Sequence, residues 1–236
     1  MPDIFALASD SRIFSANAAY STARSATTGT VDPVSNTTAI VGIVRFSARG
    51  GGNTVRINRL FFDFDTSGIS VTPSSAELKF RINGQATETS NSNLIAVKSD
   101  AFTNSNALQD SDYNNIDIST PYTVEIDSES ASAGDTITVA LNSDALSDIA
   151  ANDNFRLALI NHAHDFTNSE PSDTLNRTLT IKTANYSGTS SDPKITYVAG
   201  AAGPANLTSL NGIAKASITN VNTITVANIT SINTIA

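Results

Sequence analysis

Two histidines and an aspartate lie close together in the second half of the chain, in the segment His162-Ala163-His164-Asp165. In a β-strand the two imidazoles would share one face, because side chains two residues apart point the same way, and Asp165 could join them from the adjoining loop. Two imidazoles and a carboxylate form a set that binds zinc or iron. The chain has no third histidine to strengthen such a site. We favour the alternative, a polar pair where a strand at residues 155–160 runs into a loop.

A second group of candidate ligands is the pair Asp63 and Asp65, which flank Phe64. Their carboxylates would also share one face of a strand, and Asp100 from a nearby loop would supply further oxygens. Calcium prefers several oxygen ligands, so the set is suited at most to a structural calcium ion that pins a loop. A glycosidase would need two positioned acids in a cleft lined by aromatic rings, and the chain has no tryptophan for stacking on sugar.

Other catalytic motifs are absent from the sequence. There is no cysteine, which excludes disulfides, cysteine-ligated zinc and thiol catalysis. No G-x-S-x-G motif of a serine hydrolase occurs, and the glycines at residues 50–52 lack the lysine that completes a phosphate-binding loop. The sequence therefore predicts a protein that is not an enzyme and that has no cofactor, apart from the structural calcium ion considered above.

The charge pattern argues against nucleic acid as a partner. The chain has 14 Lys and Arg against 22 Asp and Glu, which gives a formal net charge of −8. Binding to phosphates needs clustered cations. Arg45, Arg49, Arg56 and Arg59 instead alternate with apolar residues, as expected for the solvent face of a strand or for local ion pairs.

The ends and hydropathy of the chain indicate neither export nor insertion into a membrane. Residues 1–3 lack the basic start of a secretory signal peptide, and no long apolar run follows them. No stretch approaches the roughly 18 apolar residues that a membrane helix needs. We therefore expect a protein made in the cytoplasm without a signal peptide and without a membrane partner.

Short runs of alternating β-branched and aromatic residues, separated by turn-rich segments, predict an all-β fold. The strongest strand covers residues 54–65, where the alternation slips near Arg59 and Leu60 and suggests a β-bulge. One helix is predicted at residues 143–151, with Asn142 or Ser143 as its cap. The pattern is typical of an antiparallel β-sandwich or jelly roll with one short helix. The other predicted strands are residues 4–8, 12–14, 40–48, 75–82, 94–97, 122–126, 136–141, 155–160, 175–183 and 192–198, and most of 15–38 and 99–120 is predicted to be loop.

The last thirty residues repeat with a period of eleven. They are rich in Ile, Val, Thr and Asn, which disfavours a helix and favours a β-type repeat. One thin repeat buries too little surface to be ordered alone. We therefore predict a body at residues 1–199, a Gly/Ala/Pro linker at 200–206, and an oligomerisation or anchoring tail at 207–236 that forms a homotrimer or lies on a neighbouring subunit. The aliphatic residues that would make these contacts are Leu207, Leu210, Ile213, Ile218, Val221, Ile224, Ile229, Ile232 and Ile235.

Several segments resemble a known β-sandwich family. Residues 59–69, RLFFDFDTSGI, and 74–80, SSAELKF, are similar to its pattern of an aromatic strand ending in F-D-x-S followed by S-A-x-L. Residues 192–195, DPKI, resemble its last strand. The tail is similar to I-x-x-[IV]-N-G-[IV]-x-x-A repeats of virion proteins from tailed, often marine, phages. Asn211-Gly212-Ile213 matches that repeat, whereas Thr223 and Thr234 stand where glycine is expected.

The resemblance implies a jelly-roll virion protein, because the family includes phage structural domains as well as carbohydrate-binding modules. Three functions remain open. The first is a non-enzymatic capsid-decoration or cement protein that binds itself and other virion proteins through residues 207–236. The second is a tail-fibre or host-binding module that recognises surface glycan through residues 99–120 and 162–174. The third is a glycan-active enzyme, for which no convincing acid pair exists. We favour the first.

Overall fold

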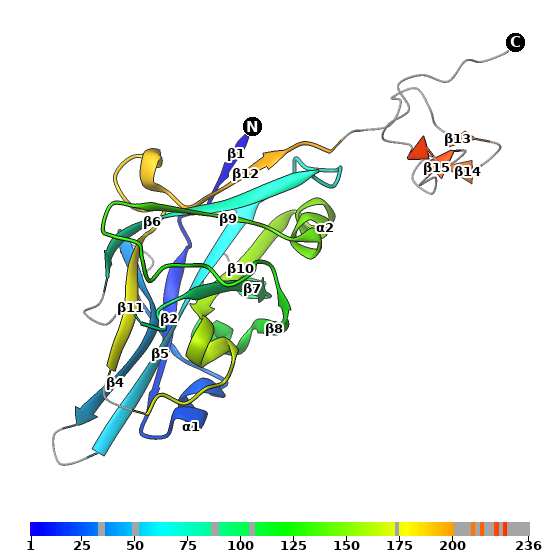
Figure 1. The fold of residues 1–236 in the computed structure, drawn as a ribbon. Helices are drawn as coiled ribbons and strands as arrows, with labels where there is room; N and C mark the ends of the chain where they lie inside the picture. Colours follow the sequence, from blue (N-terminus) through cyan, green and yellow to red (C-terminus); the bar gives the residue numbers. More distant parts are fainter. Residues whose placement is uncertain are drawn as a thin grey trace, which may run out of the picture.

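The computed structural model describes residues 1–32, 36–48, 52–85, 90–103, 107–172 and 175–200, together with four two-residue strands beyond them. All the strand pairs in the described part of the chain are antiparallel (Figure 1). The prediction of an all-β, antiparallel fold is therefore confirmed.

The strands of the body form one continuous 12-stranded sheet that folds into two layers, as in a sandwich, and we call these layers the smaller and the larger sheet (Figure 1). The smaller sheet runs in the order β1 (Asp3–Phe5), β12 (Lys194–Val198), β6 (Ser75–Gln85) and β9 (Thr136–Ala140). The larger sheet contains β11 (Leu175–Lys182), β4 (Thr38–Ala48), β5 (Gly52–Asp65), β10 (Asn154–Asn161), β7 (Leu94–Ser99) and β8 (Ile116–Pro121), with β2 (Ser11–Asn17) and β3 (Thr30–Val31) beside β5. Strand β6 joins the sheets, because its first part pairs with β12 and β9 and its end pairs with β11.

Strand β5 is the centre of the larger sheet. β2 lies along one of its edges, whereas β4 and β10 share the other edge, β4 beside the first half of β5 and β10 beside the second. β4 leaves β5 at Gly42, which has a φ of +119°, and a Cβ there would stand 2.2 Å from the carbonyl oxygen of Arg177. Only glycine combines this φ with so close an approach, so Gly42 allows β10 to replace β4 along the edge.

The predicted bulge in β5 is wrong, because its pairing with β2, β4 and β10 runs without a register shift. The alternation is broken in the sequence because both faces of the strand are buried. Each face takes alternate residues of the strand. One face carries Leu60, Phe62 and Phe64, and the other carries Val55, Ile57, Arg59 and Phe61.

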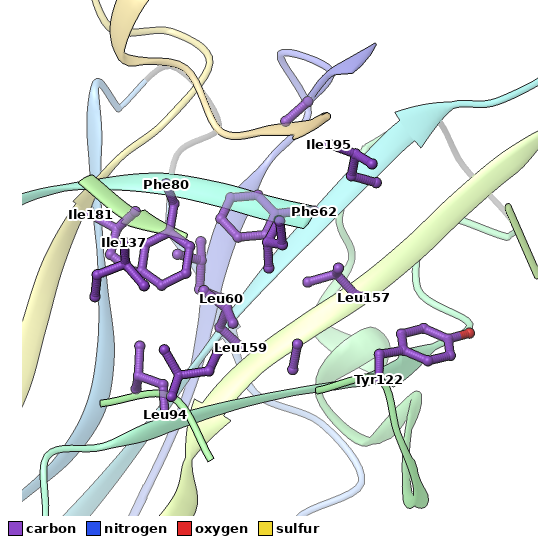
Figure 2. Packing of buried hydrophobic residues seen from close by; sticks show 14 of the residues in the cluster. Leu60, Phe62, Phe80, Leu94, Tyr122, Ile137, Leu157, Leu159, Ile181 and Ile195 are labelled. Atoms are coloured by element: carbon purple, nitrogen blue, oxygen red, sulfur yellow. The ribbon is translucent and has the colours of Figure 1, made fainter. Parts of the chain in front are cut away.

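An apolar core fills the space between the two sheets (Figure 2). Aromatic rings of three elements meet in it: the ring centroids of Phe64 and Phe155 are 6.3 Å apart, and those of Phe155 and Tyr122 are 5.0 Å apart. Full burial of one such large apolar side chain stabilises the fold by about 1.5–3 kcal/mol. The strands contribute Leu60, Phe62, Leu78, Phe80, Ile82, Leu157, Leu159, Leu179, Ile181 and Ile195, all buried.

Helix α2 (Ser143–Ala151) covers one side of this core, as predicted. The Asn142 side chain accepts hydrogen bonds from the backbone N–H groups of Asp144 and Ala145, both at 3.1 Å, and so caps the helix. Ala145 and Ile149, four residues apart, are fully buried against the core. The sequence therefore predicted both the helix and its cap.

The opposite face of β5 is covered by segments predicted to be loops. These segments contain the helix α1 (Tyr20–Arg24), the 3-10 helix η1 (Asp110–Asn114) and the π-helical turn η2 (His162–Phe166). They enclose a second, mixed interior in which apolar residues surround the buried arginine Arg59. Its buried apolar members are Ile13, Tyr20, Ala23, Ile43, Val55, Ile57, Phe61, Ile95, Val97, Ala101, Phe102, Leu108, Tyr113, Ala158, Ile160 and Leu175.

Two local predictions, for residues 15–38 and for residues 122–126, differ from the structure. Residues 15–38 were predicted to be a loop with at most one short strand; they contain the short strand β3 but also the end of β2 and the helix α1. The strand predicted at residues 122–126 lies earlier, at β8; Tyr122 lies in a bend, and Ile126 forms an isolated β-bridge with Leu94. Both residues are buried and hydrogen-bond to β7 through Ala96 and Leu94, which explains why they resemble strand residues in the sequence. A further 3-10 helix, η3 (Thr189–Ser191), precedes β12.

The described part of the tail consists of two antiparallel pairs of short strands. β13 (Ser209–Leu210) pairs with β14 (Ile213–Ala214), and β15 (Asn220–Val221) pairs with β16 (Ile224–Thr225). The rest of the predicted repeat and the linker at 201–206 lie outside the described residues. Among the described residues, no helix is long and apolar enough to cross a membrane.

Candidate functional site

The two histidines lie in a π-helical turn and not in a strand. β10 ends at Asn161, whose side-chain oxygen accepts a hydrogen bond from the backbone N–H of His164 at 2.7 Å and so starts η2. In a helical turn, residues two apart do not face each other. His162 and His164 therefore do not share a strand face, which was the condition of the metal-site alternative, because a capping asparagine ends the strand one residue before them.

The two imidazoles have different environments. His162 Nδ1 lies 3.2 Å from the carboxylate of Glu125. His164 is buried, with Nδ1 2.7 Å from the Ser169 carbonyl oxygen and Nε2 2.7 Å from the Arg177 guanidinium. Because arginine only donates, Nε2 is the acceptor, and Nδ1 carries the proton that it donates to Ser169. Both ring nitrogens of His164 therefore connect η2 to neighbouring segments.

Asp165 is fully buried and belongs to an ion pair. It accepts hydrogen bonds from Nε and Nη2 of Arg59, both at 2.8 Å, and Nε of Arg24 lies 3.6 Å from its carboxylate. Such a bidentate arginine–carboxylate pair fixes both partners in orientation. Across the ranges that the structure describes, no three His, Asp or Glu side chains gather into a group suited to a metal ion.

Arg59 is buried among four acceptors. Besides Asp165, its Nη1 donates to the Tyr113 carbonyl at 2.7 Å, its Nη2 donates to the Arg24 carbonyl at 3.1 Å, and its guanidinium lies 4.1 Å from the centre of the Tyr113 ring. Burial acts to lower the pKa of Arg59, but the Asp165 carboxylate outweighs burial and raises it above its ordinary value. Arg59 therefore stays charged inside the protein.

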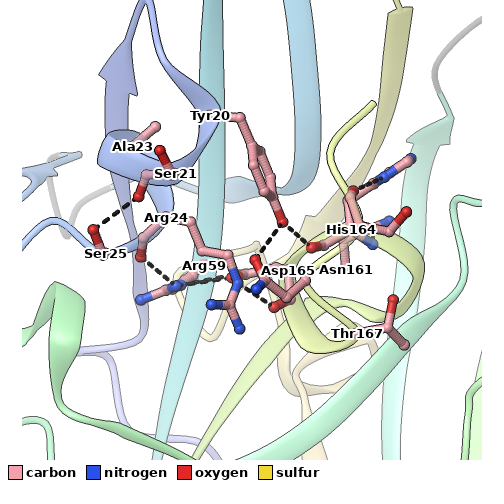
Figure 3. Close-up of polar contacts among 12 residues, drawn as sticks. Tyr20, Ser21, Ala23, Arg24, Ser25, Arg59, Asn161, His164, Asp165 and Thr167 are labelled. Atoms are coloured by element: carbon pink, nitrogen blue, oxygen red, sulfur yellow. Dashed lines mark hydrogen bonds and ion pairs between the residues drawn. The ribbon is translucent and has the colours of Figure 1, made fainter. Parts of the chain in front are cut away.

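Two buried tyrosines complete this cluster. The Tyr20 hydroxyl donates to the His164 carbonyl, and the Tyr113 hydroxyl donates to the Ala23 carbonyl at 2.9 Å. Burial raises the pKa of Tyr20 to about 12 and also raises the pKa of Tyr113. We call Tyr20, Arg24, Arg59, Tyr113 and Asp165 the Arg59 cluster. It fastens α1, η1 and η2 to β5, and Figure 3 shows Tyr20, Arg24 and Arg59 converging on the turn that carries Asp165.

The structure gives the predicted calcium ligands separate partners. Asp63 is buried, accepts a hydrogen bond from Asn154 Nδ2 at 3.0 Å and lies 3.4 Å from Arg156 Nε. Asp65 is exposed and accepts hydrogen bonds from the Ser67 backbone N–H at 3.1 Å and hydroxyl at 2.6 Å. Burial raises the pKa of Asp63, whereas the Ser67 hydrogen bonds lower that of Asp65.

A small polar pocket of about 90 Å³ lies between β7, α2 and β10. At its wall the Asp148 carboxylate accepts hydrogen bonds from the Tyr122 hydroxyl and from Lys98 Nζ, the latter at 2.8 Å. The hydrogen bond to Asp148 raises the pKa of Lys98, and burial followed by the same carboxylate raises that of Tyr122. The predicted ligand Asp100 also lines this pocket, so it lies beside a lysine that is already paired with another carboxylate.

A larger pocket of about 310 Å³ opens beside the Arg59 cluster. Arg24 and Arg59 line it, together with Ser25, Asn114, Ile116 and Ile118. It lies where α1 meets η1 and the start of β8. This is the one place among the described pockets where two guanidinium groups meet apolar and amide side chains.

The sequence pattern predicted that Arg59 lies on the solvent face of a strand or in a local ion pair, and it gave no prediction for Arg24. One signal was available: Arg59 interrupts the longest apolar strand of the chain, and a buried arginine needs a buried acid. The identity of that acid, 106 residues away, was not contained in the local pattern.

The predicted tail contacts are described only in part. Leu210, Ile213, Val221 and Ile224 lie in β13 to β16, where Leu210 pairs with Ile213 and Val221 with Ile224. Each member of the second pair lies eleven residues after its equivalent in the first. Leu207, Ile218, Ile229, Ile232 and Ile235 lie outside the described residues.

Comparison with known sequences adds no family assignment: no protein-family model matches the chain, and no curated protein matches it.

Proposed function

We propose that the chain is a non-enzymatic structural protein of a phage virion, of the capsid-decoration or cement type, and that it attaches through residues 207–236. The proposal starts from the resemblance of residues 59–69, 74–80 and 192–195 to β-sandwich phage proteins and of the tail to virion repeats. The antiparallel β-sandwich of the body supports it.

One observation carries the proposal: the first and last strands of the body pair with each other. Asp3 stands opposite Thr196 and Phe5 opposite Lys194, so the chain enters and leaves the body at the same edge of the smaller sheet (Figure 1). After β12, Gly200 packs on the backbone of Thr72, where a Cβ would stand 2.0 Å from its carbonyl oxygen. The repeat therefore leaves from a fixed point, as suits an attachment segment.

The pairing of the charged side chains supports a structural rather than a catalytic role. Asp165 is paired with Arg59, and Asp148 with Lys98. A general acid or base must be within reach of a substrate proton, whereas the Asp165 carboxylate is fully buried behind arginine. These groups hold segments together.

The mechanism we propose is mechanical. Aliphatic residues of the repeat are buried at junctions with neighbouring subunits in a homotrimer or with other virion proteins, because one repeat alone buries too little surface. The acidic, hydroxyl-rich body, with a net charge of −8 for the whole chain, stays soluble on the outside of the particle.

The test compares the full chain with a chain that ends at Gly200. The described hydrophobic core runs from Ala6 to Ile195, so the shorter chain keeps it whole. We expect the shorter chain to be a folded monomer in analytical ultracentrifugation and the full chain to be a trimer or to cosediment with purified particles. Equal mass and equal particle binding for both chains would refute the proposal.

Copy number separates decoration from a fibre. A decoration protein is present in many stoichiometric copies over the capsid surface in images of the virion, whereas a fibre or host-binding module is present in few copies at the tail. Localisation at the tail would replace the capsid assignment with the fibre assignment.

A further inference from the structure

The pocket beside the Arg59 cluster has an arginine whose orientation is fixed. Arg24 donates from Nε to the Asp165 carbonyl at 2.8 Å, and its side chain is 18% exposed. Among the residues that the structure describes, neither of its terminal nitrogens makes a hydrogen bond with the protein. Because Nε is held, the two Nη groups form a pre-positioned fork at the wall of the pocket.

The local charge balance leaves one positive charge. Arg24 and Arg59 face a single carboxylate, Asp165, and Arg59 binds that carboxylate with two hydrogen bonds. The next charged group acting on this cluster is Glu170, which lies 3.6 Å from Arg45 and is thereby paired elsewhere. The charge of Arg24 is therefore available to an anion in the pocket.

The other walls of the pocket suit a ring that carries hydroxyl groups. Ile116 and Ile118 provide an apolar side, and Ile118 is 39% exposed. Asn114 provides an exposed amide, and the Ser25 hydroxyl, which donates to the Ser21 carbonyl at 2.8 Å, still has lone pairs to accept with. A volume of about 310 Å³ is larger than a simple anion needs and falls at the small end of ligand sites.

We propose that this pocket binds an acidic sugar unit, with the ligand carboxylate on the Nη groups of Arg24, the apolar face of the ring against Ile116 and Ile118, and hydroxyl groups on Asn114 and Ser25. The pairing of a planar guanidinium with a planar carboxylate through two hydrogen bonds explains why the ligand is a carboxylate. The apolar wall explains why it is attached to a ring.

The position of the pocket suits recognition of an external ligand. α1 lies at the end of the sandwich away from β1 and β12, where the body is joined to the tail (Figure 1). An anchored body would thus present the pocket outward. The binding proposal does not depend on the anchoring, since the body forms the pocket alone.

The experiment is a titration of the full chain with sodium glucuronate, and binding is measured by isothermal titration calorimetry or by changes in NMR chemical shift. Glucose, acetate and inorganic phosphate are titrated in parallel. We expect saturable binding of glucuronate, and binding of the other three that is weaker by about ten-fold or more, since each lacks either the carboxylate or the ring.

Variants locate the site. Arg24→Gln is expected to weaken glucuronate binding by about ten-fold or more, while Arg81→Gln, on the outer face of β6, leaves it unchanged. Ile118→Glu, at an exposed position, places a repelling charge at the pocket wall and tests the site even if Arg24→Gln disturbs folding. Three results would each overturn the proposal: no saturable glucuronate binding, phosphate binding as tight as glucuronate, or affinity within two-fold of the parent in both Arg24→Gln and Ile118→Glu.

Discussion

Strand β5 has two buried faces, and they are stabilised by different chemistry. From Leu60 to Phe64 one face lies against a second sheet and is apolar, whereas earlier in the strand the same face carries the buried Asn58. The face with Arg59 and Phe61 lies against short helices and turns and contains a buried ion pair. Regular strands satisfy their own backbone groups, whereas turns leave carbonyls unpaired. Arg59 supplies donors for two of these carbonyls, those of Arg24 and Tyr113.

The comparison teaches that a buried charged side chain can hold short helices and turns in place where no neighbouring strand pairs with their backbone. The ion pair costs desolvation, so it is a poor source of net stability. The ion pair instead determines orientation, because one guanidinium donates hydrogen bonds to α1, η1 and η2 and so fixes their positions relative to β5. An apolar side chain in its place would leave those backbone carbonyls without partners.

The largest effect is expected from breaking the ion pair on one side. Arg59→Met leaves the fully buried Asp165 without its bidentate partner, which is expected to lower the free energy of unfolding by about 3–5 kcal/mol in urea denaturation.

The matched control is Arg81→Met, since Arg81 makes an exposed hydrogen bond to the Gly134 carbonyl and a long one, at 3.4 Å, to the Ser191 hydroxyl, but, in the described part of the chain, no ion pair with a buried carboxylate. Its expected cost is about 0.5 kcal/mol. The double variant Arg59→Met/Asp165→Leu is expected to recover part of the loss, because no charge stays buried alone. Equal costs for Arg59→Met and Arg81→Met would contradict the role of the ion pair.

Asp10 is a buried carboxylate that, unlike Asp165, has no arginine partner among the described residues, so it shows what burial does without an ion pair. Asp10 is 1% exposed, its Oδ2 accepts from the Ala184 N–H at 2.9 Å, and burial raises its pKa from 3.8 to about 7. As pH rises from about 4 to 7, the unfolded chain releases this proton before the folded chain does. Stability is therefore expected to fall across this window, by up to about 4 kcal/mol, and then to level off.

Asp10→Asn is expected to remove this loss, so that the variant gains stability relative to the parent at pH 8 and not at pH 4, as measured by urea denaturation at both values. Asp65→Asn provides the control, because Asp65 is exposed and its pKa is lowered. A parent whose stability rises between pH 4 and 7, with no gain from Asp10→Asn, would show that Asp10 is ionised in the folded protein.

A substitution on the apolar face of β5 is expected to cost less stability than Arg59→Met, the substitution at the neighbouring position on the ionic face. Leu60→Ala is expected to cost about 3 kcal/mol, as lost transfer free energy and an unfilled cavity. This cost should not change with the pH of the measurement, because leucine and alanine carry no ionisable group. A pH-dependent cost for Leu60→Ala would mean that the two faces are coupled.

The smallest effect is expected at the cap of α2, which covers the apolar core. Asn142→Ala removes the acceptor for two backbone N–H groups and is expected to cost about 1 kcal/mol in thermal unfolding. Ser143→Ala, one residue later, serves as the control, because its side chain makes no capping hydrogen bond. A larger loss of stability in Ser143→Ala than in Asn142→Ala would show that Asn142 is not the residue that caps the helix.

Elements whose residues follow a simple local pattern, such as β6 and α2, could be predicted from the sequence. The alternation of Leu78, Phe80 and Ile82 predicted β6, and the cap and apolar spacing predicted α2. Where both faces of a strand are buried, alternation disappears, so β5 was predicted with a bulge that it does not have. Residues such as Tyr122, which anchor a bend by burial, were taken for a strand for the same reason: burial and strand formation select the same residue types.

The candidate site was less predictable, because its parts come from distant segments. Asp165 was singled out, but as a metal ligand beside His164 and not as the partner of Arg59. The spacing of two histidines says nothing about the asparagine cap that turns the chain into η2. Arg24 lies in a stretch of small polar residues with no strong helical signal, so neither α1 nor its pocket could be foreseen.

The pairing of β1 with β12 also sets an order of events during synthesis. At about 5–20 residues per second, roughly 10 to 40 s separate the synthesis of these two strands. Until then, β1 has no partner along the edge that it shares with Lys194 and Thr196. Its three-residue length and its aspartate make it a poor template for wrong partners during that wait. The smaller sheet thus closes on the newest part of the nascent body, immediately before the repeat is made.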